Sequence, residues 1–419
     1  MSLLSAAMRE AAASIFPDIP ISREADFAPM CDLSSGDFSS SVAIEVARSI
    51  KRDANGIAHE ILNRMPSALV GQARSDAGYI VCSGLPRDIV VDEVPVDVRA
   101  ALGVDADHPR SICCLLPDIT EPLYARLRLL ARVSLQGLLG VMYQGRCTLR
   151  LEPEPAVEVA SVGEVIKLFR SAVERALRSE GEIRLSISSI PEGTRENPVF
   201  VWTSHHYHDR LLQSDRKALG EARRHGTIAL RMPEDAWLLS RDRVRSDLLE
   251  RRSLERVITQ LGSDAAWMRF LFHASSSVLS GDFDPAVALF DEFASPLYSF
   301  SVLVSRYQRF NQSFPLPVTR GQLVSALPEI GSDRSLILRS LCMPIYTARA
   351  VRRGELDEWC VAFEDLVRQG HRFINAPQTR FSLQHGSLSA GVSEIVAGLG
   401  FGLSSILGFV TEGDACADR

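Results

Sequence analysis

The chain has 419 residues, of which 46% are hydrophobic and 23% charged, so it can bury a sizeable core and is not intrinsically disordered. Its formal net charge of −6 excludes a basic field over the whole surface, so any nucleic-acid binding must depend on local basic patches. The eight cysteines contain no Cys-x-x-Cys pair and are too sparse for a disulfide scaffold. We therefore expect reduced thiols, no zinc ribbon and a cytoplasmic location.

The residue patterns near the two ends of the chain do not predict a membrane segment. Charged Arg9 and Glu10 interrupt the first 16 residues, which favour an amphipathic helix over a secretory signal. Glycine and serine residues break the longest apolar run, 395–410, which falls short of the about 20 residues that a bilayer span needs. We expect a buried terminal helix there.

Residues 1–110 are expected to mix helices with a strand. Apolar residues recur at helical spacing over residues 39–52 and again over 57–65, and Pro66 follows the second helix. Residues 78–81 have the composition of a strand.

Residues 111–255 alternate between strand and helix patterns, which favours a parallel sheet. The predicted strands are 112–116, 149–159, 183–190 and 198–202, and the predicted helices are 123–143 and 165–177. Residues 256–419 carry mainly helical patterns, which predict a bundle. Its helices are expected at 254–261, 265–272, 285–290, 296–310, 336–350, 355–373 and 388–410.

Two parts of the sequence resemble arginyl-tRNA synthetases. Near the N-terminus, Gly36-Asp37-Phe38 and residues 57–61 resemble the Gly-Asp-Tyr run and the next helix of the family's accessory domain. Near the C-terminus, residues 262–272 resemble the segment that names the Asp-Ala-Leu-Arg (DALR) anticodon-binding domain, and His371-Arg372-Phe373-Ile374-Asn375 resembles its His-Arg-Phe-Tyr-Asn stretch.

The resemblance implies three domains in an α+β or α/β multidomain chain. Residues 1–110 would be an α/β accessory domain that contacts the tRNA elbow. Residues 111–255 would be a shortened, Rossmann-like class I catalytic domain, and residues 256–419 an all-α anticodon-binding bundle.

The catalytic signatures of the family are degenerate in this sequence. In the His-x-Gly-His turn, Tyr124 stands for the first histidine, Arg126 for the glycine and Leu127 for the second histidine. Glu121 replaces a lysine, and its charge would repel the phosphates of ATP. The resemblance therefore implies no catalytic residues here and no ATP or other cofactor.

The second signature, Lys-Met-Ser-Lys, is also degenerate. Its nearest equivalent is Leu238-Leu239-Ser240-Arg241, in which only Arg241 keeps a positive charge. The chain between the two signatures has roughly half the length expected for the family.

A polar cluster containing His205, His206 and His208 resembles the family's Asp-His-His strand end near the nucleotide. It is either a residual nucleotide or metal site, or the vestigial end of a strand with satisfied imidazoles. Adjacent residues on a strand point to opposite faces, so His205 and His206 are poorly placed to share one metal ion. We expect no metal.

Basic patches supply the candidate tRNA contacts. Guanidinium groups pair with phosphate, and an aromatic ring can stack on an unstacked base. The alternative is a solvated, salt-bridged helix, which the acidic residues interleaved around Arg241 and Arg243 favour. The candidate contacts are Arg306, Tyr307, Arg309, Arg349, Arg372, Asn375, Arg241 and Arg243.

Three functions are compatible with these observations. The first is a non-catalytic tRNA-binding adaptor or regulator, a pseudoenzyme with arginine tRNA as ligand, which presents tRNA to a modifying enzyme or synthetase. The second is a repurposed enzyme that activates or transfers arginine, motivated by the histidine cluster and Arg241. The third is a protein-interaction module that partners a true synthetase, motivated by the acidic charge.

Overall fold

The computed structural model describes part of the chain, and every structural statement below concerns that part. The described residues are 3–22, 25–30, 33, 35–70, 72–85, 89–90, 93–95, 98–103, 111–114, 123–151, 156–178, 199–203, 227–231, 255–256, 258–275, 296–313, 332–377, 379, 396, 399–400 and 403. The chain forms two compact units. Unit 1 comprises Met1–Ala101, Arg306–Ile345 and Arg368–Ser405, and unit 2 comprises Leu102–Ser305, Tyr346–Val367 and Ile406–Arg419.

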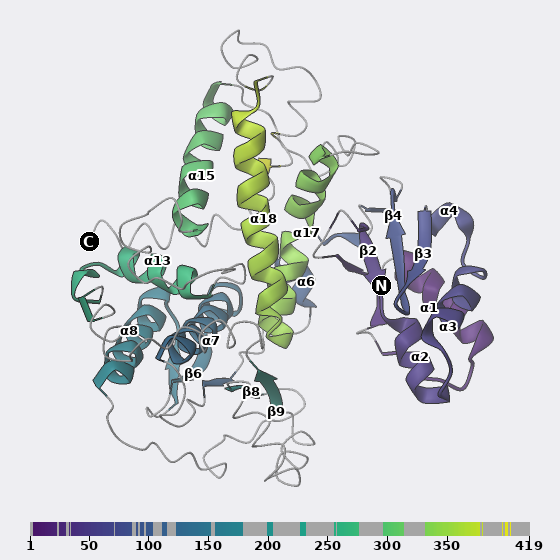
Figure 1. Ribbon diagram of the computed structural model, residues 1–419, viewed down its shortest axis with the longest axis horizontal. Helices are drawn as coiled ribbons and strands as arrows, with labels where there is room; N and C mark the ends of the chain where they lie inside the picture. The colour runs from purple at the N-terminus through teal and green to yellow at the C-terminus, as the bar shows by residue number, and fades with distance from the viewer. Residues whose placement is uncertain are drawn as a thin grey trace. The chain divides into compact units, whose positions relative to one another are not determined.

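The N-terminal part of unit 1 is an antiparallel sheet accompanied by helices (Figure 1). The strand order is β1-β2-β4-β3, and each neighbouring pair runs antiparallel. The strands are β1 (Ala28–Pro29), β2 (Phe38–Ser40), β3 (Gln72–Asp76) and β4 (Tyr79–Ser83). The helices are α1 (Leu3–Ile15), α2 (Val42–Ile50), α3 (Ala54–Leu62) and α4 (Ser67–Val70), and α6 (Val98–Leu102) follows them in the chain.

Local sequence explains two of these elements. Helix α3 begins where it does because the carboxylate of Asp53 accepts a hydrogen bond of 2.7 Å from the backbone N–H of Gly56. Strands β3 and β4 form a hairpin whose turn residues, Ala77 and Gly78, both have positive φ, at 48° and 84°. That is the conformation of a type I′ turn, whose twist matches the twist of the strands.

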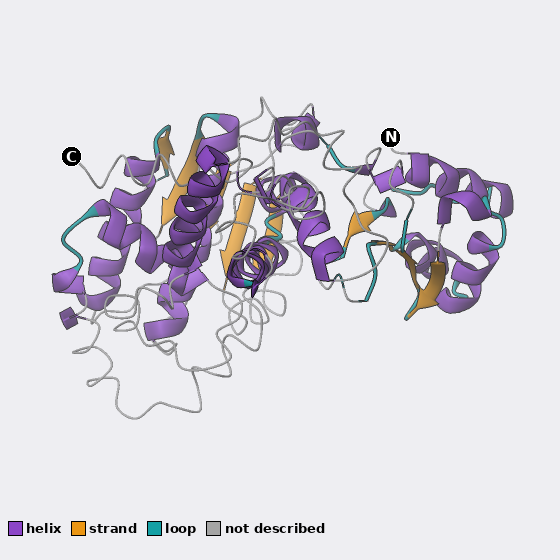
Figure 2. Ribbon diagram, turned by 90° about the horizontal axis from the view of Figure 1, so that it is seen from above, coloured by secondary structure: helices purple, strands orange, loops and turns teal. Residues whose placement is uncertain are grey.

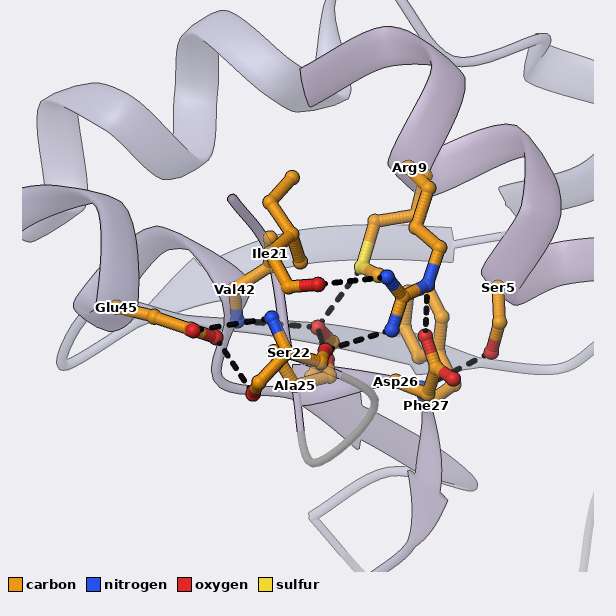
Figure 3. Close-up of polar contacts among 11 residues, drawn as sticks. Ser5, Arg9, Ile21, Ser22, Ala25, Asp26, Phe27, Val42 and Glu45 are labelled. Carbon is orange, nitrogen blue, oxygen red and sulfur yellow. Dashed lines mark hydrogen bonds and ion pairs between the residues drawn. The ribbon is translucent and has the colours of Figure 1, made fainter. Parts of the chain in front are cut away.

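A polar network fixes the segment that joins α1 to the sheet (Figure 3). The guanidinium of Arg9 bonds to the Asp26 carboxylate at 2.6 Å and donates to the carbonyls of Ile21, at 2.9 Å, and Ser22, at 2.6 Å. The carboxylate of Glu45, on α2, accepts from both the backbone N–H and the hydroxyl of Ser22, each at 3.0 Å. Arg9 of α1 and Glu45 of α2 therefore hold this connection in place.

Unit 2 contains a mostly parallel sheet of five strands in the order β7-β6-β5-β8-β9. Strands β6, β5, β8 and β9 run parallel, and only β7 is antiparallel to its neighbour. The strands are β5 (Ser111–Cys114), β6 (Cys147–Leu151), β7 (Val157–Val159), β8 (Val199–Thr203) and β9 (Thr227–Arg231). Helices α7 (Leu123–Gln144), α8 (Val162–Arg178) and α13 (Asp264–Ser275) pack on one another, and helices accompany the strands in Figure 2.

Helix α7 is the central element of unit 2, because its residues 127–141 are all buried. Gly137 and Gly140 let α7 approach β6 closely. A Cβ at position 137 would lie 3.3 Å from Leu149, and a Cβ at position 140 would lie 3.4 Å from Cys147. An aromatic cluster joins α8 to α13, with the ring centroids of Phe169 and Trp267 6.0 Å apart. The core of unit 2 therefore lies around α7.

Three long helices follow and contribute to both units: α15 (Pro296–Ser313), α17 (Ser332–Arg353) and α18 (Leu356–Asn375). Helices α17 and α18 form a hairpin around Gly354, which has a φ of 70°. In unit 2, the indole N–H of Trp359 on α18 donates to the hydroxyl of Thr347 on α17 at 3.0 Å. Phe300 of α15 packs on Phe363 of α18 with ring centroids 5.2 Å apart.

The α/β character of residues 111–231 and the helical character of the C-terminal part are confirmed. The prediction of one strand over residues 149–159 is wrong, because β6 and β7 are separate strands that pair antiparallel. The helix predicted over residues 39–52 begins only at Val42, because Ser39 and Ser40 belong to β2. Predicted elements at 183–190 and 285–290 lie outside the described residues. The division into domains at 110 and 255 stays a prediction. No helix among the described residues is long and apolar enough to span a bilayer.

Candidate functional site

The order of the parallel strands indicates where a ligand site can form. From β5, the chain adds β6 and then β7 on one side of the sheet and β8 and β9 on the other. The order therefore reverses between β5 and β8, whose residues Cys114 and Trp202 are paired near the carboxyl ends of the two strands. In open α/β sheets, ligands bind outside the carboxyl ends of the strands at such a reversal. We call this edge the switch point.

Helix α7 follows β5 and carries Tyr124, Arg126 and Leu127, which the sequence predicts to be the degenerate first signature. Leu127, which stands for the second signature histidine, is 0% exposed. A buried aliphatic side chain can neither donate a hydrogen bond nor carry charge, so it cannot stabilise a developing phosphate charge. The side chains of Tyr124 and Arg126 lie outside the described residues, so their roles stay predictions.

The other residues that the sequence predicts for the catalytic site lie outside the described residues. Strand β8 ends at Thr203, and His205, His206 and His208 follow it in sequence but lie outside the described residues, as do Leu238, Ser240, Arg241 and Arg243. Within the described part of the chain, no cluster of three or more His, Cys, Asp or Glu side chains could hold a metal ion.

Sequence reasoning missed two buried arginines on α7, Arg128 and Arg132, one helical turn apart. Arg132 is 1% exposed, and its Nη1 lies 2.5 Å from an Asp357 carboxylate oxygen on α18. Burial, together with the charge of Arg132, lowers the pKa of Arg128 to about 10. The available signal in the sequence was that these two arginines are flanked on both sides by leucine, alanine and valine residues. The two arginines tie α7 to the first turns of α18.

Four arginines lie on α15 and α18 near the point where these two helices meet in unit 1. Arg306 on α15 donates to the Asn375 side-chain oxygen on α18 at 3.1 Å, so the helices meet at these two residues. Arg309 also lies on α15, and exposed Arg368 and Arg372 lie on α18. Neither residues 306–313 nor residues 368–375 contain Asp or Glu. We call residues 306–313 and 368–375 the arginine surface.

Two of the predicted RNA contacts have partners within the protein. Tyr307 is 8% exposed, and its hydroxyl lies so close to Gly400 that a Cβ there would be 1.8 Å away. Burial raises the pKa of Tyr307, and its ring faces are not open for base stacking. Arg349 contacts the carboxylates of Glu355 at 2.6 Å and Glu358 at 2.7 Å, so its charge is already compensated.

Comparison with protein-family models and with curated proteins finds no match. Among solved structures, the chain is similar to a Thermus thermophilus arginyl-tRNA synthetase, with a TM-score of 0.45 and 11% identity over 96% of this chain and 98% of that chain. A similarity with a TM-score below 0.5 does not support a conclusion about function.

Proposed function

We propose that this chain is a tRNA-binding protein of arginyl-tRNA synthetase-like architecture that lacks ligase chemistry, with arginine tRNA as its ligand. It would act as an adaptor or regulator that presents the bound tRNA to a modifying enzyme or to a synthetase. The main support for the loss of the ligase reaction is the complete burial of Leu127, at a position where the family signature has a histidine.

The energetics at Leu127 support this proposal. Adenylate formation concentrates negative charge on phosphate oxygens, and catalysis needs preorganised donors or cations aimed at that charge. Leu127 is part of a continuous buried run on α7, and Leu129 and Leu130 beside it are also buried. A polar group placed there would lose water without gaining a phosphate contact, so this helix face has become core.

The arginine surface supports the RNA-binding half of the proposal. Its four guanidiniums come from two segments without any acidic residue, in a chain whose net charge is −6. Phosphates attract such a surface, while the acidic remainder repels them, so RNA would bind in one orientation. The alternative is that the arginines only complement the carboxyl ends of α15 and α18, which carry negative partial charge.

The proposal that the chain binds tRNA is tested by sequencing the RNA that co-purifies with the full chain, with bulk cellular RNA as the reference. We expect tRNA, and arginine tRNA in particular, to be enriched, and filter binding to give the same preference. Arginine-dependent exchange of pyrophosphate into ATP tests the chemistry, and we expect none. Exchange activity would favour the repurposed enzyme, whereas a protein that co-purifies without RNA would favour the interaction module.

A further inference from the structure

The Gly36-Asp37-Phe38 run forms a buried ion pair with a residue almost 300 positions later in the chain. An Asp37 carboxylate oxygen lies 2.5 Å from Nη2 of Arg334, on the first turn of α17, and the other lies 3.4 Å from Nε. Asp37 is 4% exposed and Arg334 is 6% exposed. Both residues belong to unit 1. The pair therefore joins the N-terminal sheet directly to α17.

Further bonds close this contact into a network. The Asp37 carboxylate accepts from the backbone N–H of Leu85 at 3.1 Å, and Arg334 donates to the Leu85 carbonyl at 3.3 Å. Arg339, one and a half turns further along α17, donates to the Met30 carbonyl at 3.4 Å. Gly36 makes room for the turn, since a Cβ there would lie 2.5 Å from a Val81 methyl group.

This geometry specifies an orientation more than it adds stability. Removing two charges from water costs free energy that their attraction only partly returns, and an apolar pair of similar volume would hold two elements together at lower cost. A guanidinium and a carboxylate, however, meet side by side through two bonds in one plane. With Arg339 as a second point of attachment, the network fixes the rotation of α17 about its own axis.

The orientation of α17 bears on the arginine surface because both belong to unit 1. The part of α17 that carries Arg334 and Arg339, residues 332–345, lies in the same compact unit as residues 306–313 and 368–375. Helix α18 carries Arg372 and reaches α15 through Asn375.

We infer that Asp37 and Arg334 are positioning residues for RNA binding, which fix α17 and thereby the spacing of the arginines on α15 and α18. This inference rests on the proposed function. It assigns to the Gly-Asp-Phe run a role within the protein, away from any RNA.

A comparison of variants of the full chain tests the inference. Asp37→Asn and Arg334→Gln remove one charge each, and Arg334→Lys keeps the charge but loses the planar fork. The matched control is Arg9→Gln, because the Arg9–Asp26 pair lies in the same unit but ties together only N-terminal elements. RNA affinity and its salt dependence are measured with unfractionated tRNA, at a temperature where circular dichroism shows every variant folded.

We expect Asp37→Asn and Arg334→Gln to weaken tRNA binding by roughly 2- to 30-fold, with a smaller loss for Arg334→Lys and none for Arg9→Gln. Amide hydrogen exchange over residues 332–345 should accelerate in the first two variants and stay unchanged in the control. The comparison at a temperature where every variant is folded separates a loss of RNA affinity from a loss of stability.

Three results would overturn the inference. The first is wild-type affinity in Asp37→Asn and Arg334→Gln, and the second is an equal loss in Arg9→Gln. The third is unchanged exchange over residues 332–345 in all variants, which refutes the orientation argument even without RNA. Failure of the wild-type chain to bind any tRNA would instead refute the proposed function itself, and would leave nothing for this pair to position.

Discussion

The arginine surface allows a quantitative prediction, tested by replacing Arg309 and Arg372 with glutamine. Both side chains are exposed, one on α15 and one on α18, so each substitution should change the free energy of unfolding by less than about 0.5 kcal/mol. The main effect should therefore fall on RNA binding. Arg146 is the control, because it is 59% exposed in unit 2 and paired with Glu158.

The magnitude follows from counterion release. Each phosphate neutralised by a cation adds about 0.9 to the slope of log affinity against log salt, so losing two contacts lowers the slope by about 1.8. At 0.1 M salt the double variant should bind tRNA roughly 60-fold more weakly than the wild type. Filter binding over a range of salt concentrations measures both quantities. An unchanged slope, or an equal drop in Arg146→Gln, would refute the assignment of this surface.

Four further changes test the fold and the degenerate signature. Leu127→His should lower the free energy of unfolding by about 3 kcal/mol in a urea titration and restore no ATP–pyrophosphate exchange, because it buries an unpaired imidazole. Ala77→Asn should raise stability by about 1 kcal/mol, since Ala77 has a φ of 48° that asparagine tolerates better. Gly78→Ala should cost about 2–4 kcal/mol, because the new Cβ would lie 2.7 Å from that of Ala54 at a φ of 84°. Burial raises the pKa of Cys147 from 9.0 to about 12, so its contribution to stability is complete below pH 9 and declines as the pH rises toward 12. The stability difference between wild type and Cys147→Ala should therefore shrink by about 1.4 kcal/mol between pH 7.5 and pH 10, and a constant difference would contradict the burial argument.

Periodic apolar patterns predicted the long helices of this protein. Helix α7 was predicted over residues 123–143 and spans Leu123–Gln144, because an apolar-rich stretch of this length without proline is too long for a strand. The short strands of unit 1 were harder to predict. Strand β3, with the sequence Gln-Ala-Arg-Ser-Asp, has little apolar character, and it forms because β4 supplies its hydrogen bonds.

The division between β6 and β7 was missed although the sequence carried a signal. Pro153 and Pro155 stand between the two strands, and proline cannot donate a hydrogen bond to a strand ladder. The alternation of apolar residues on both sides of them favoured a single strand over residues 149–159. The antiparallel pairing of β6 and β7 depends on contacts that no local pattern encodes.

For the candidate site, the sequence indicated which residues could bind RNA but not which side chains they contact within the protein. Basic patches and the family resemblance predicted Arg306, Arg372 and Asn375 as RNA contacts, and Arg306 and Asn375 are hydrogen-bonded in the structure. The sequence could not show that the carboxylates of Glu355 and Glu358 already compensate the charge of Arg349. Nor could it show that a buried ion pair occupies Asp37, since its partner Arg334 is so distant in the chain. Residue types were therefore more predictable than their partners.

The network around Arg9 has a practical consequence for shortening this protein. Its guanidinium binds Ile21, Ser22 and Asp26, which precede the strand that begins at Ala28. A chain trimmed to begin after the first helix, at Pro20, would leave the Asp26 carboxylate and the Ser22 carbonyl without the guanidinium that binds both. The smallest autonomous version of the N-terminal sheet should therefore begin at the first helix.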